Sequence, residues 1–241
     1  MIRQTLGKIF REQSFHPTLL GVFVNPFFIA RRGLAGAVRE CARPLRGRLL
    51  DVGCGTKPYE RFFQVEQYVG LDIESARTRA SAVADHYYDG RRFPFVDCSF
   101  DAVLCNQVLE HVFNPHEFVA EMHRVLKPGG RLVLTVPFVW DEHEQPFDYA
   151  RYSSFGLRAL FEEKGFVIER HKKINANVSV IFQLMNAYLY KILPKPLMMH
   201  LIVCATMMAP ISVLGVILSK ILPDNEDLYL DQIILAKKLT Q

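Results

Sequence analysis

Short apolar segments alternate with helix-patterned segments through most of the chain. Seven of them have the length and composition of buried strands, at residues 48–52, 68–72, 82–88, 102–105, 131–136, 166–171 and 229–237. Most of the intervening segments carry the capping residues, proline or glycine that bound helices. The alternation predicts an α/β fold: a Rossmann-like, mainly parallel seven-stranded sheet with helices on both faces.

Two of the predicted helices carry start signals. Asn114 can cap the first, Pro115 suits its first position, and Glu117 lies where the acid of a capping box belongs. Ser153 can cap the second, and Gly165 ends it. Because both helices flank predicted strands, they support the alternating order of the fold.

A glycine turn follows the first strand, in the segment Leu49-Leu50-Asp51-Val52-Gly53-Cys54-Gly55. The next strand ends at an acid, Asp72, whose carboxylate can accept hydrogen bonds from both hydroxyls of a ribose. A dinucleotide fold needs a third glycine at position 58, where this chain has Pro58. The pattern therefore favours a nucleoside-containing cofactor without a pyrophosphate.

Polar residues also follow the third and fourth predicted strands. These are Asp89 and Asn106, and they occur at the same interval of about 20 residues that separates Gly53 from Asp72. Ligands of open α/β sheets bind beyond the carboxyl ends of the strands. Each residue alone could be an ordinary turn residue, but together they predict one crevice.

Charge is distributed unevenly along the chain, whose net charge is +4. Residues 1–48 hold nine basic and two acidic residues, a net charge of +7, so the remainder carries −3. The basic segment fits either a solvated helix face or an anionic membrane surface. We expect an N-terminal basic helical segment at residues 1–47 and a second domain at residues 48–241.

Five cysteines form neither a C-x-x-C pair nor a Cys/His cluster with the spacing of a zinc site. They fit buried free thiols in a reducing compartment, so we expect a cytoplasmic protein without a metal site. The apolar stretch from Leu19 to Ala30 could mimic a signal peptide. Asn25-Pro26 interrupts it and Arg31-Arg32 follows it, so we expect it to be retained.

An apolar helical insertion is predicted at residues 174–222, between the last two strands. Pro194-Lys195-Pro196 breaks it, and residues 197–219 would extend about 34 Å as a helix, enough for a bilayer core of about 30 Å. Since the last strand returns to the same sheet, any crossing must be paired. Residues 178–222 could enter the membrane as a hairpin, lie in its interface, or pack on the N-terminal helix. Gln183, Asn186 and Lys191 make residues 178–193 polar for a membrane span, which favours shallow insertion. Five lysines, at positions 172, 173, 191, 195 and 220, suit the anionic cytoplasmic leaflet.

Four segments make the chain resemble the class I S-adenosylmethionine-dependent methyltransferases, in the type 11 group. They are LLDVGCGTKPY (49–59), GLDI (70–73), DGRRFPFVDCSFDAVLCNQVLEHV (89–112) and HRVLKPGGRLVLTVPF (123–138). The resemblance implies S-adenosylmethionine as cofactor. It implies that Asp51, Gly53 and Gly55 line the methionine part, Asp72 holds the ribose, and Asp89 with Gly90 contacts the adenine. Asp85 is the alternative adenine acid. Asn106 and Gln107 would lie beside the cofactor.

The segment after the fifth strand resembles the H-x-x-P-x-D-Y-x-R-Y signature of bacterial methyltransferases found with surface-polysaccharide biosynthesis. A base is needed when the attacking atom must lose a proton. We expect His143 to be that base, ahead of His111, with Asp148 and Arg151 orienting the substrate. The alternative for Asp148 and Arg151 is a structural pair that holds the loop.

These features predict methyl transfer to a small-molecule or glycan-like acceptor, linked to a lipid in one version of the hypothesis, at the cytoplasmic membrane face. A quinone or lipid methyltransferase is the second hypothesis, and a non-catalytic cofactor-binding scaffold is the third. The chain lacks an N-P-P-Y-type signature, so we expect no nucleic-acid partner.

Overall fold

The computed structural model describes residues 2–193 and 196–240, so the predicted break at Pro194 and Lys195 lies outside the described residues. The chain forms two compact units. Unit 1 comprises Met1–Ala37, Val139–Asp141 and Lys173–Asp231, and unit 2 comprises Val38–Phe138, Glu142–Lys172 and Gln232–Gln241. Each unit is described by itself below.

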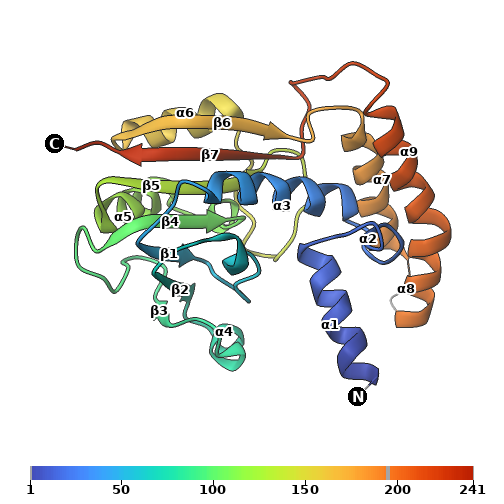
Figure 1. Cartoon of the computed structure of the whole chain (residues 1–241), viewed down its shortest axis with the longest axis horizontal. Helices are drawn as coiled ribbons and strands as arrows, with labels where there is room; N and C mark the ends of the chain where they lie inside the picture. Colours follow the sequence, from blue (N-terminus) through green and yellow to red (C-terminus); the bar gives the residue numbers. More distant parts are fainter. Residues whose placement is uncertain (1, 194–195, 241) are drawn as a thin grey trace. The chain divides into compact units, whose positions relative to one another are not determined.

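The sheet has the seven predicted strands, in the order β3-β2-β1-β4-β5-β7-β6 (Figure 1). Their bounds are β1 Arg48–Val52, β2 Gln67–Ile73, β3 His86–Tyr88, β4 Phe100–Asn106, β5 Leu126–Pro137, β6 Phe166–Ile174 and β7 Asp231–Lys238. The first five strands pair in parallel. Figure 1 shows β7 running opposite to β6. The order changes direction at β1, next to β4, which is where α/β sheets of this kind bind ligands.

The core of unit 2 lies between the sheet and two helices, α5 Pro115–Val125 and α6 Ser154–Glu163. Val119 and Met122 of α5 and Phe161 of α6 are fully buried against strand residues such as Leu50 and Leu134. Shorter helical segments connect the strands: η1 Glu60–Phe62, α4 Ala76–Ser81 and η2 Leu109–His111. The predicted α/β class with a Rossmann-like sheet is confirmed.

Two local predictions have different outcomes. Ser153 caps α6, because its hydroxyl accepts a hydrogen bond from the Gly156 N–H at 3.1 Å. Asn114 makes no side-chain cap, so the cap predicted for α5 is wrong and only Pro115 at the helix start remains. β5 is also longer than the predicted strand at residues 131–136, since it begins at Leu126 and runs through Gly129 and Gly130 to Pro137.

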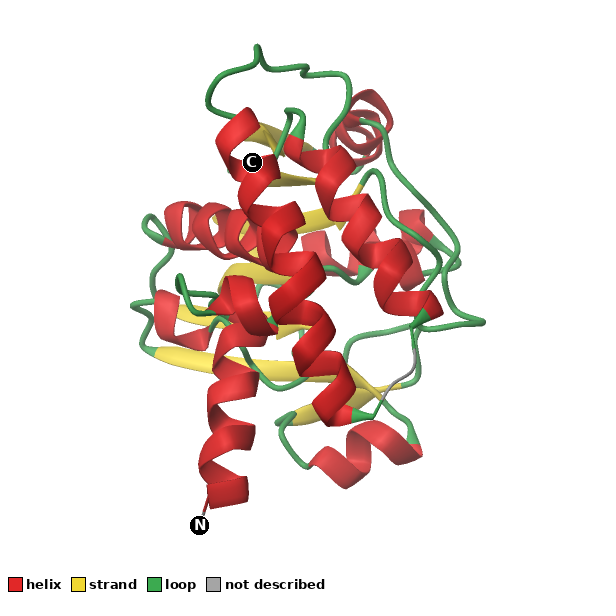
Figure 2. Cartoon of the chain, turned by 90° about the vertical axis from the view of Figure 1, so that its right-hand side faces the viewer, coloured by secondary structure: helices red, strands yellow, loops and turns green. Residues whose placement is uncertain are grey.

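Unit 1 is helical, and its core joins α2 Gly21–Val24 to the predicted apolar insertion. It also contains α1 Ile2–Phe15 and the first part of α3 Phe28–Ala42. The insertion forms α7 Ser179–Ile192 and a second helix made of α8 Leu197–Val203, a π turn η3 Cys204–Met208, and α9 Ala209–Leu218. Figure 2 shows α7 and α9 side by side, in agreement with their contacts.

The helices of unit 1 are joined by buried amide side chains. Gln183 of α7 donates to the Pro26 carbonyl at 3.0 Å and accepts from the Ala30 N–H at 3.2 Å. Asn186 donates to the Ser212 hydroxyl at 2.9 Å and to the Met208 carbonyl at 3.1 Å. Both amides are completely buried. Their hydrogen bonds fix how the helices pack together more specifically than apolar contacts alone would.

Replacing Gln183 by Ala should lower the free energy of unfolding by about 2–4 kcal/mol, because it opens a cavity and leaves two backbone groups without their partner. Chemical denaturation followed by circular dichroism measures the change. Ile181→Ala, on the half-exposed side of the same helix, is the control and should cost less than about 1 kcal/mol. Equal effects of the two variants would contradict the role of Gln183.

Candidate active site at the carboxyl ends of the strands

The turn after β1 has the backbone that glycine permits. Gly53 has a φ of 70° and Gly55 a φ of 50°, both in the left-handed region that most residues avoid. A side chain at Gly53 would overlap Val108, which follows β4. At Gly55 a Cβ would meet nothing within 4 Å. The turn therefore packs against the β4 loop at one glycine and faces open space at the other.

Asp72 lies next to this turn, since its carboxylate accepts a hydrogen bond from the Gly55 N–H at 3.2 Å. Burial raises the pKa of Asp72. Asp51 is 3% exposed and accepts a hydrogen bond from the Tyr68 hydroxyl at 2.7 Å. Burial raises the pKa of Asp51 to about 7. Two carboxylates thus flank the turn in differently exposed surroundings.

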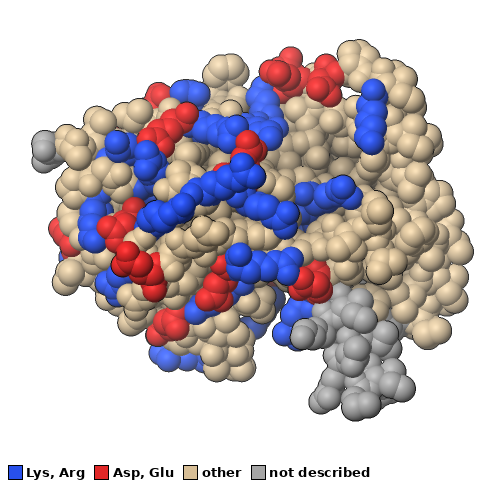
Figure 3. Space-filling view, in the orientation of Figure 1, with Lys and Arg blue, Asp and Glu red and all other residues tan. Residues whose placement is uncertain are grey.

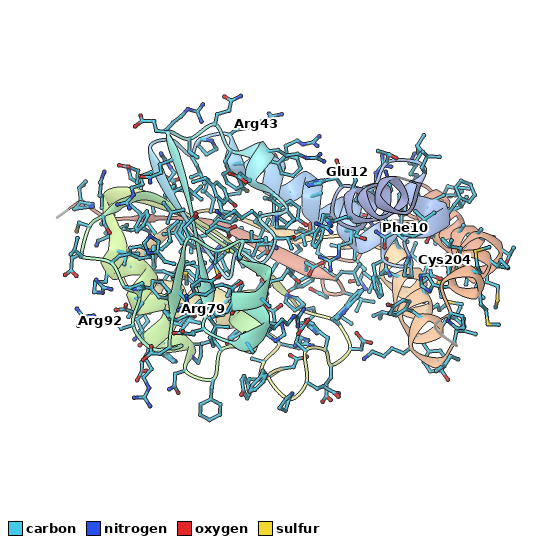
Figure 4. All side chains as sticks on the ribbon, turned by 90° about the horizontal axis from the view of Figure 1, so that it is seen from below. Phe10, Glu12, Arg43, Arg79, Arg92 and Cys204 are labelled. Atoms are coloured by element: carbon cyan, nitrogen blue, oxygen red, sulfur yellow. The ribbon has the colours of Figure 1, made fainter. Side chains whose placement is uncertain are left out.

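Asp89 and Gly90 form an exposed turn after β3. The Asp89 carboxylate accepts from the backbone N–H of Arg91 at 2.9 Å, and this bond lowers the pKa of Asp89. Arg92 points away from the sheet there (Figure 4). Asp85 lies elsewhere: it pairs with Lys57 at 2.6 Å and accepts from the Gly70 N–H at 2.6 Å. Asp85 is therefore engaged in joining the β1 loop to β2, whereas Asp89 stands at the strand end.

Asn106 and Gln107 end β4 and are held by Thr135 of the neighbouring strand. The Thr135 hydroxyl donates to the Asn106 side chain at 2.8 Å and accepts from the Gln107 side chain at 3.3 Å. Gln107 has a φ of 55°, so the chain turns sharply there. The structure brings the ends of β1, β2 and β4 to adjacent positions in the sheet, because β1 pairs with both β2 and β4.

The loop after β5 contains the predicted catalytic residues. Asp148 is almost fully buried and accepts hydrogen bonds from both terminal nitrogens of Arg151, at 2.6 and 2.8 Å. The carboxylate also accepts from the His143 N–H at 2.9 Å and lies 3.3 Å from the Nδ1 atom of the same residue. Arg151 chiefly, with His143, lowers the pKa of Asp148 to about 2. Asp148 is therefore a charged group that orients His143 and Arg151.

This loop is fixed to η2, which follows β4. The Glu110 carbonyl accepts from the N–H groups of Tyr149 and Ala150, at 2.8 and 3.3 Å. The His111 Nδ1 atom lies 2.7 Å from the Phe147 carbonyl oxygen. The His111 and His143 rings meet edge to face with centroids 4.8 Å apart. His111 and His143, the two histidines predicted from the sequence as candidate bases, therefore lie next to each other and beside Glu110.

Comparisons with known proteins agree with this geometry. Residues 50–134 match the model of the "Methyltransferase domain" family. The match covers the glycine turn, Asp72, Asp89 and η2. S-adenosylmethionine is therefore the cofactor of the domain.

Relatives with assigned names share this domain. The chain is 33% identical over 135 residues to the ubiquinone biosynthesis O-methyltransferase of Maricaulis maris, covering 50% of each chain. It is 41% identical over 101 residues to the demethylmenaquinone methyltransferase of Deinococcus radiodurans, covering 36% of this chain and 42% of that one. The chain thus spans about half the length of the relatives it matches.

A solved structure shows the same fold over most of the chain. The phosphoethanolamine N-methyltransferase 2 of Haemonchus contortus, solved with S-adenosyl-L-methionine, matches with a TM-score of 0.57 and 18% identity. The match covers 96% of this chain and 60% of that one. At this identity the likeness concerns the fold of the methyltransferase domain and not its acceptor.

No role in the site was predicted from the sequence for Glu110, Tyr68 or Thr135. Thr135 could have been found from strand register, because it pairs directly with Asn106 in the sheet. Tyr68 carried no local signal, because its contact with Asp51 depends on how β1 and β2 align. The acid next to His111, just beyond a strand end, was the available signal for Glu110.

Replacing Asp51 by Asn should change how stability depends on pH. The native pKa of about 7 lies above the unfolded value of about 3.9, so folding takes up a proton between these values. The free energy of unfolding of the wild type therefore falls as the pH rises from about 4 to about 7. The amide of Asp51→Asn cannot titrate but still accepts from Tyr68, so the variant should gain on the order of 1–4 kcal/mol relative to wild type above about pH 7.

Urea titrations at about pH 4.5, 6 and 8 measure this difference, since they sample the range between the two pKa values. Asp97→Asn is the control: Arg124 lowers the pKa of this exposed acid, so its replacement should show the opposite trend. A wild-type minus Asp51→Asn difference that stays constant with pH would contradict the raised pKa.

Proposed function

We propose that the protein is an S-adenosylmethionine-dependent methyltransferase acting on a small-molecule or glycan-like acceptor at the cytoplasmic face of the membrane. The observation that carries the proposal is the methyltransferase domain with its strand-end residues in place. The glycan-like acceptor rests on the likeness of residues 143–152 to the polysaccharide-associated signature. A lipid-linked acceptor agrees with the apolar surface of unit 1 described below.

We assign the cofactor to the strand ends. When bound, S-adenosylmethionine supplies a methyl group already activated by a sulfonium. Asp72 accepts from the ribose hydroxyls, and Asp89 with Gly90 contacts the adenine edge. Asp51, Gly53 and Gly55 line the methionine part, where the open space at Gly55 fits a ligand. Asn106 and Gln107 would lie beside the cofactor.

The protein's own contribution is to orient the acceptor and accept its proton. We assign the proton to the Nε2 atom of His143, because its Nδ1 side faces the charged Asp148. This is the arrangement in which a carboxylate fixes the tautomer of a catalytic imidazole. Arg151 acts through Asp148, which it holds in place with two hydrogen bonds.

The apolar surface of unit 1 supports membrane contact. α7 buries polar Ser179, Gln183 and Asn186 and exposes apolar side chains, which reverses the pattern of a helix in a water-soluble domain. The exposed apolar residues of α7 to α9 are Ile181, Met185, Ile192, Met198, Met199, Ile202, Met207, Val213, Leu214, Ile217. Charged side chains are sparse over α8 and α9 in Figure 3. Such a surface fits hydrocarbon better than water.

Helix lengths favour insertion from one side of the bilayer. Met198–Leu218 is the one helix among the described residues that is long and apolar enough to cross a membrane, and 28% of its window is buried. α7 has 14 residues and is about 21 Å long, too short for a core of about 30 Å. Since α7 and α9 pack together, we propose that the pair enters one leaflet only.

The second candidate is methylation of a quinone or another lipid. It is favoured by the two relatives named above, whose printed functions concern ubiquinone and demethylmenaquinone. The same apolar surface would then bring the enzyme to an acceptor dissolved in the membrane. A non-catalytic scaffold is the third hypothesis.

A labelled-methyl transfer assay on glycan, lipid and RNA fractions tests the proposal and separates its versions. With the active fraction, His143→Ala should lower turnover by about 10²–10⁴-fold and leave cofactor affinity unchanged, because only proton removal is lost. Asp72→Ala should instead weaken cofactor binding by about 10–100-fold in calorimetry, because it removes a charged hydrogen-bond acceptor.

Glu74→Ala is the matched control for Asp72, because Glu74 is an exposed acid two residues further along that pairs with Arg79. Unchanged turnover of His143→Ala would remove the base, and unchanged affinity of Asp72→Ala would contradict the cofactor site. Label in the RNA fraction alone would overturn the acceptor class.

Flotation with anionic vesicles tests membrane contact. Wild type should float with the vesicles, and Ile202→Asp with Ile217→Asp should reduce the bound fraction at least about tenfold, since each apolar side chain contributes about 1.5–3 kcal/mol when buried. Val96→Asp with Phe155→Asp, on exposed apolar positions of unit 2, is the control and should still float. A wild type that ignores vesicles and stays soluble without detergent would contradict the proposal.

A further inference from the structure

Three potential metal ligands converge between η2 and the loop after β5. Glu110, His111 and His143 each offer one ligand atom, and these atoms all lie within 4.8 Å of one another. The Nε2 atom of His111 is 3.8 Å from a carboxylate oxygen of Glu110. All three residues belong to unit 2. The residues come from two segments far apart in the sequence, so no spacing motif marks them.

The burial of Glu110 fits this arrangement. Its side chain has an exposed fraction of 0%, whereas those of His111 and His143 are 20% and 31% exposed. A carboxylate that faces two imidazoles completes a ligand set suited to a transition-metal ion. The two histidines are thus the partly exposed members of the cluster, and the carboxylate is its buried member.

The contacts of the His111 and His143 rings favour the same tautomer in both, with the proton on Nδ1. A carbonyl oxygen only accepts, so the His111 Nδ1 atom at 2.7 Å from the Phe147 carbonyl must carry the proton. The His143 Nδ1 atom lies 3.3 Å from a carboxylate oxygen of the charged Asp148, which favours the tautomer with the proton on Nδ1. In each neutral ring Nε2 is then the lone-pair nitrogen. Metal-binding histidines usually donate their second nitrogen to a carbonyl or carboxylate in this way.

We propose that Glu110, His111 and His143 bind a divalent transition-metal ion, with Zn²⁺ as the ion to test. Two imidazoles and one carboxylate suit zinc and its neighbours, whereas Mg²⁺ and Ca²⁺ prefer oxygen ligands. In a tetrahedral zinc site with ligand distances of about 2.1 Å the ligand atoms lie about 3.4 Å from one another, so a separation near the 4.8 Å limit must close by about 1 Å when the ion binds. The remaining coordination positions are left for water or an acceptor oxygen.

This site shares His143 with the proposed methyl transfer, but its test is independent of that proposal because metal binding is measured without cofactor or acceptor. With the ion bound, the Nε2 atom of His143 is a ligand and cannot accept a proton. His143 can therefore act as the base only in the metal-free protein. The backbone contacts of Glu110 with Tyr149 and Ala150 fix the two ligand segments to each other, which preorganises the site.

The test is a titration of chelator-treated full-length protein with Zn²⁺ in competition with a chromogenic chelator. Wild type should bind one Zn²⁺ per chain with a Kd at or below about 1 μM, in the range of a three-ligand protein site. His111→Ala and His143→Ala should each weaken binding at least about 100-fold, and Glu110→Gln at least about tenfold. Thermal unfolding with and without Zn²⁺ should show a stabilisation in wild type that the histidine variants lose.

His116→Ala is the matched control, because His116 lies 3.4 Å from Glu163 as an exposed histidine–carboxylate pair. Its affinity for Zn²⁺ should equal that of wild type. Both ligand histidines are partly exposed, so their replacement by Ala leaves a folded protein to measure, even if Glu110→Gln does not fold. Wild type without stoichiometric Zn²⁺, or a His111→Ala, His143→Ala double variant that binds as tightly as wild type, would overturn the proposal.

Discussion

The site depends on the close approach of Val108 to the backbone of Gly53. Only a residue without a side chain can lie there, because a Cβ atom would overlap the valine. The approach places the segment after β4 against the turn after β1, at the point where the sheet order reverses. Val108 in turn precedes η2, so the position of Glu110 and His111 follows from the same contact. One glycine thus links the turn after β1 to the segment that bears Glu110 and His111.

The second half of the site is held by backbone carbonyls as well as by the Asp148 carboxylate. The carbonyl of Glu110 holds two N–H groups of the loop after β5, and the Phe147 carbonyl holds His111. Backbone bonds of this kind do not depend on which side chains the loop presents. Loop positions other than His143, Asp148 and Arg151 can therefore vary while the loop keeps its place over η2, and variable loops of this kind are where a common fold acquires specificity.

Much of the fold could be predicted from sequence because strands and turns are local patterns. The apolar segments marked all seven strands, and Gly53, Gly55 and Asp72 occupy adjacent strand ends as their spacing implied. The start of β5 was missed because Pro128-Gly129-Gly130 is typical of a turn, yet pairing with β4 extends the strand through it. The cap at Asn114 failed for a related reason: the residue has the right chemistry, but its backbone, with a ψ of 76°, does not take the cap conformation.

Sequence patterns could not predict which side chains from separate loops lie together, or which face of a helix points inward. Composition alone marked α7 as only moderately apolar because of Gln183 and Asn186, which argued against deep insertion. The structure shows that these amides face inward, each bonded to neighbouring helices, so they do not make the outer face polar. The small residues Ser212 and Gly215 lie on the packed side of α9, and Cys204 is buried in the π turn (Figure 4). Helices associate inside membranes through this combination of small residues and buried amides. The same polar residues that weakened the membrane hypothesis in the sequence therefore support it once their direction is known.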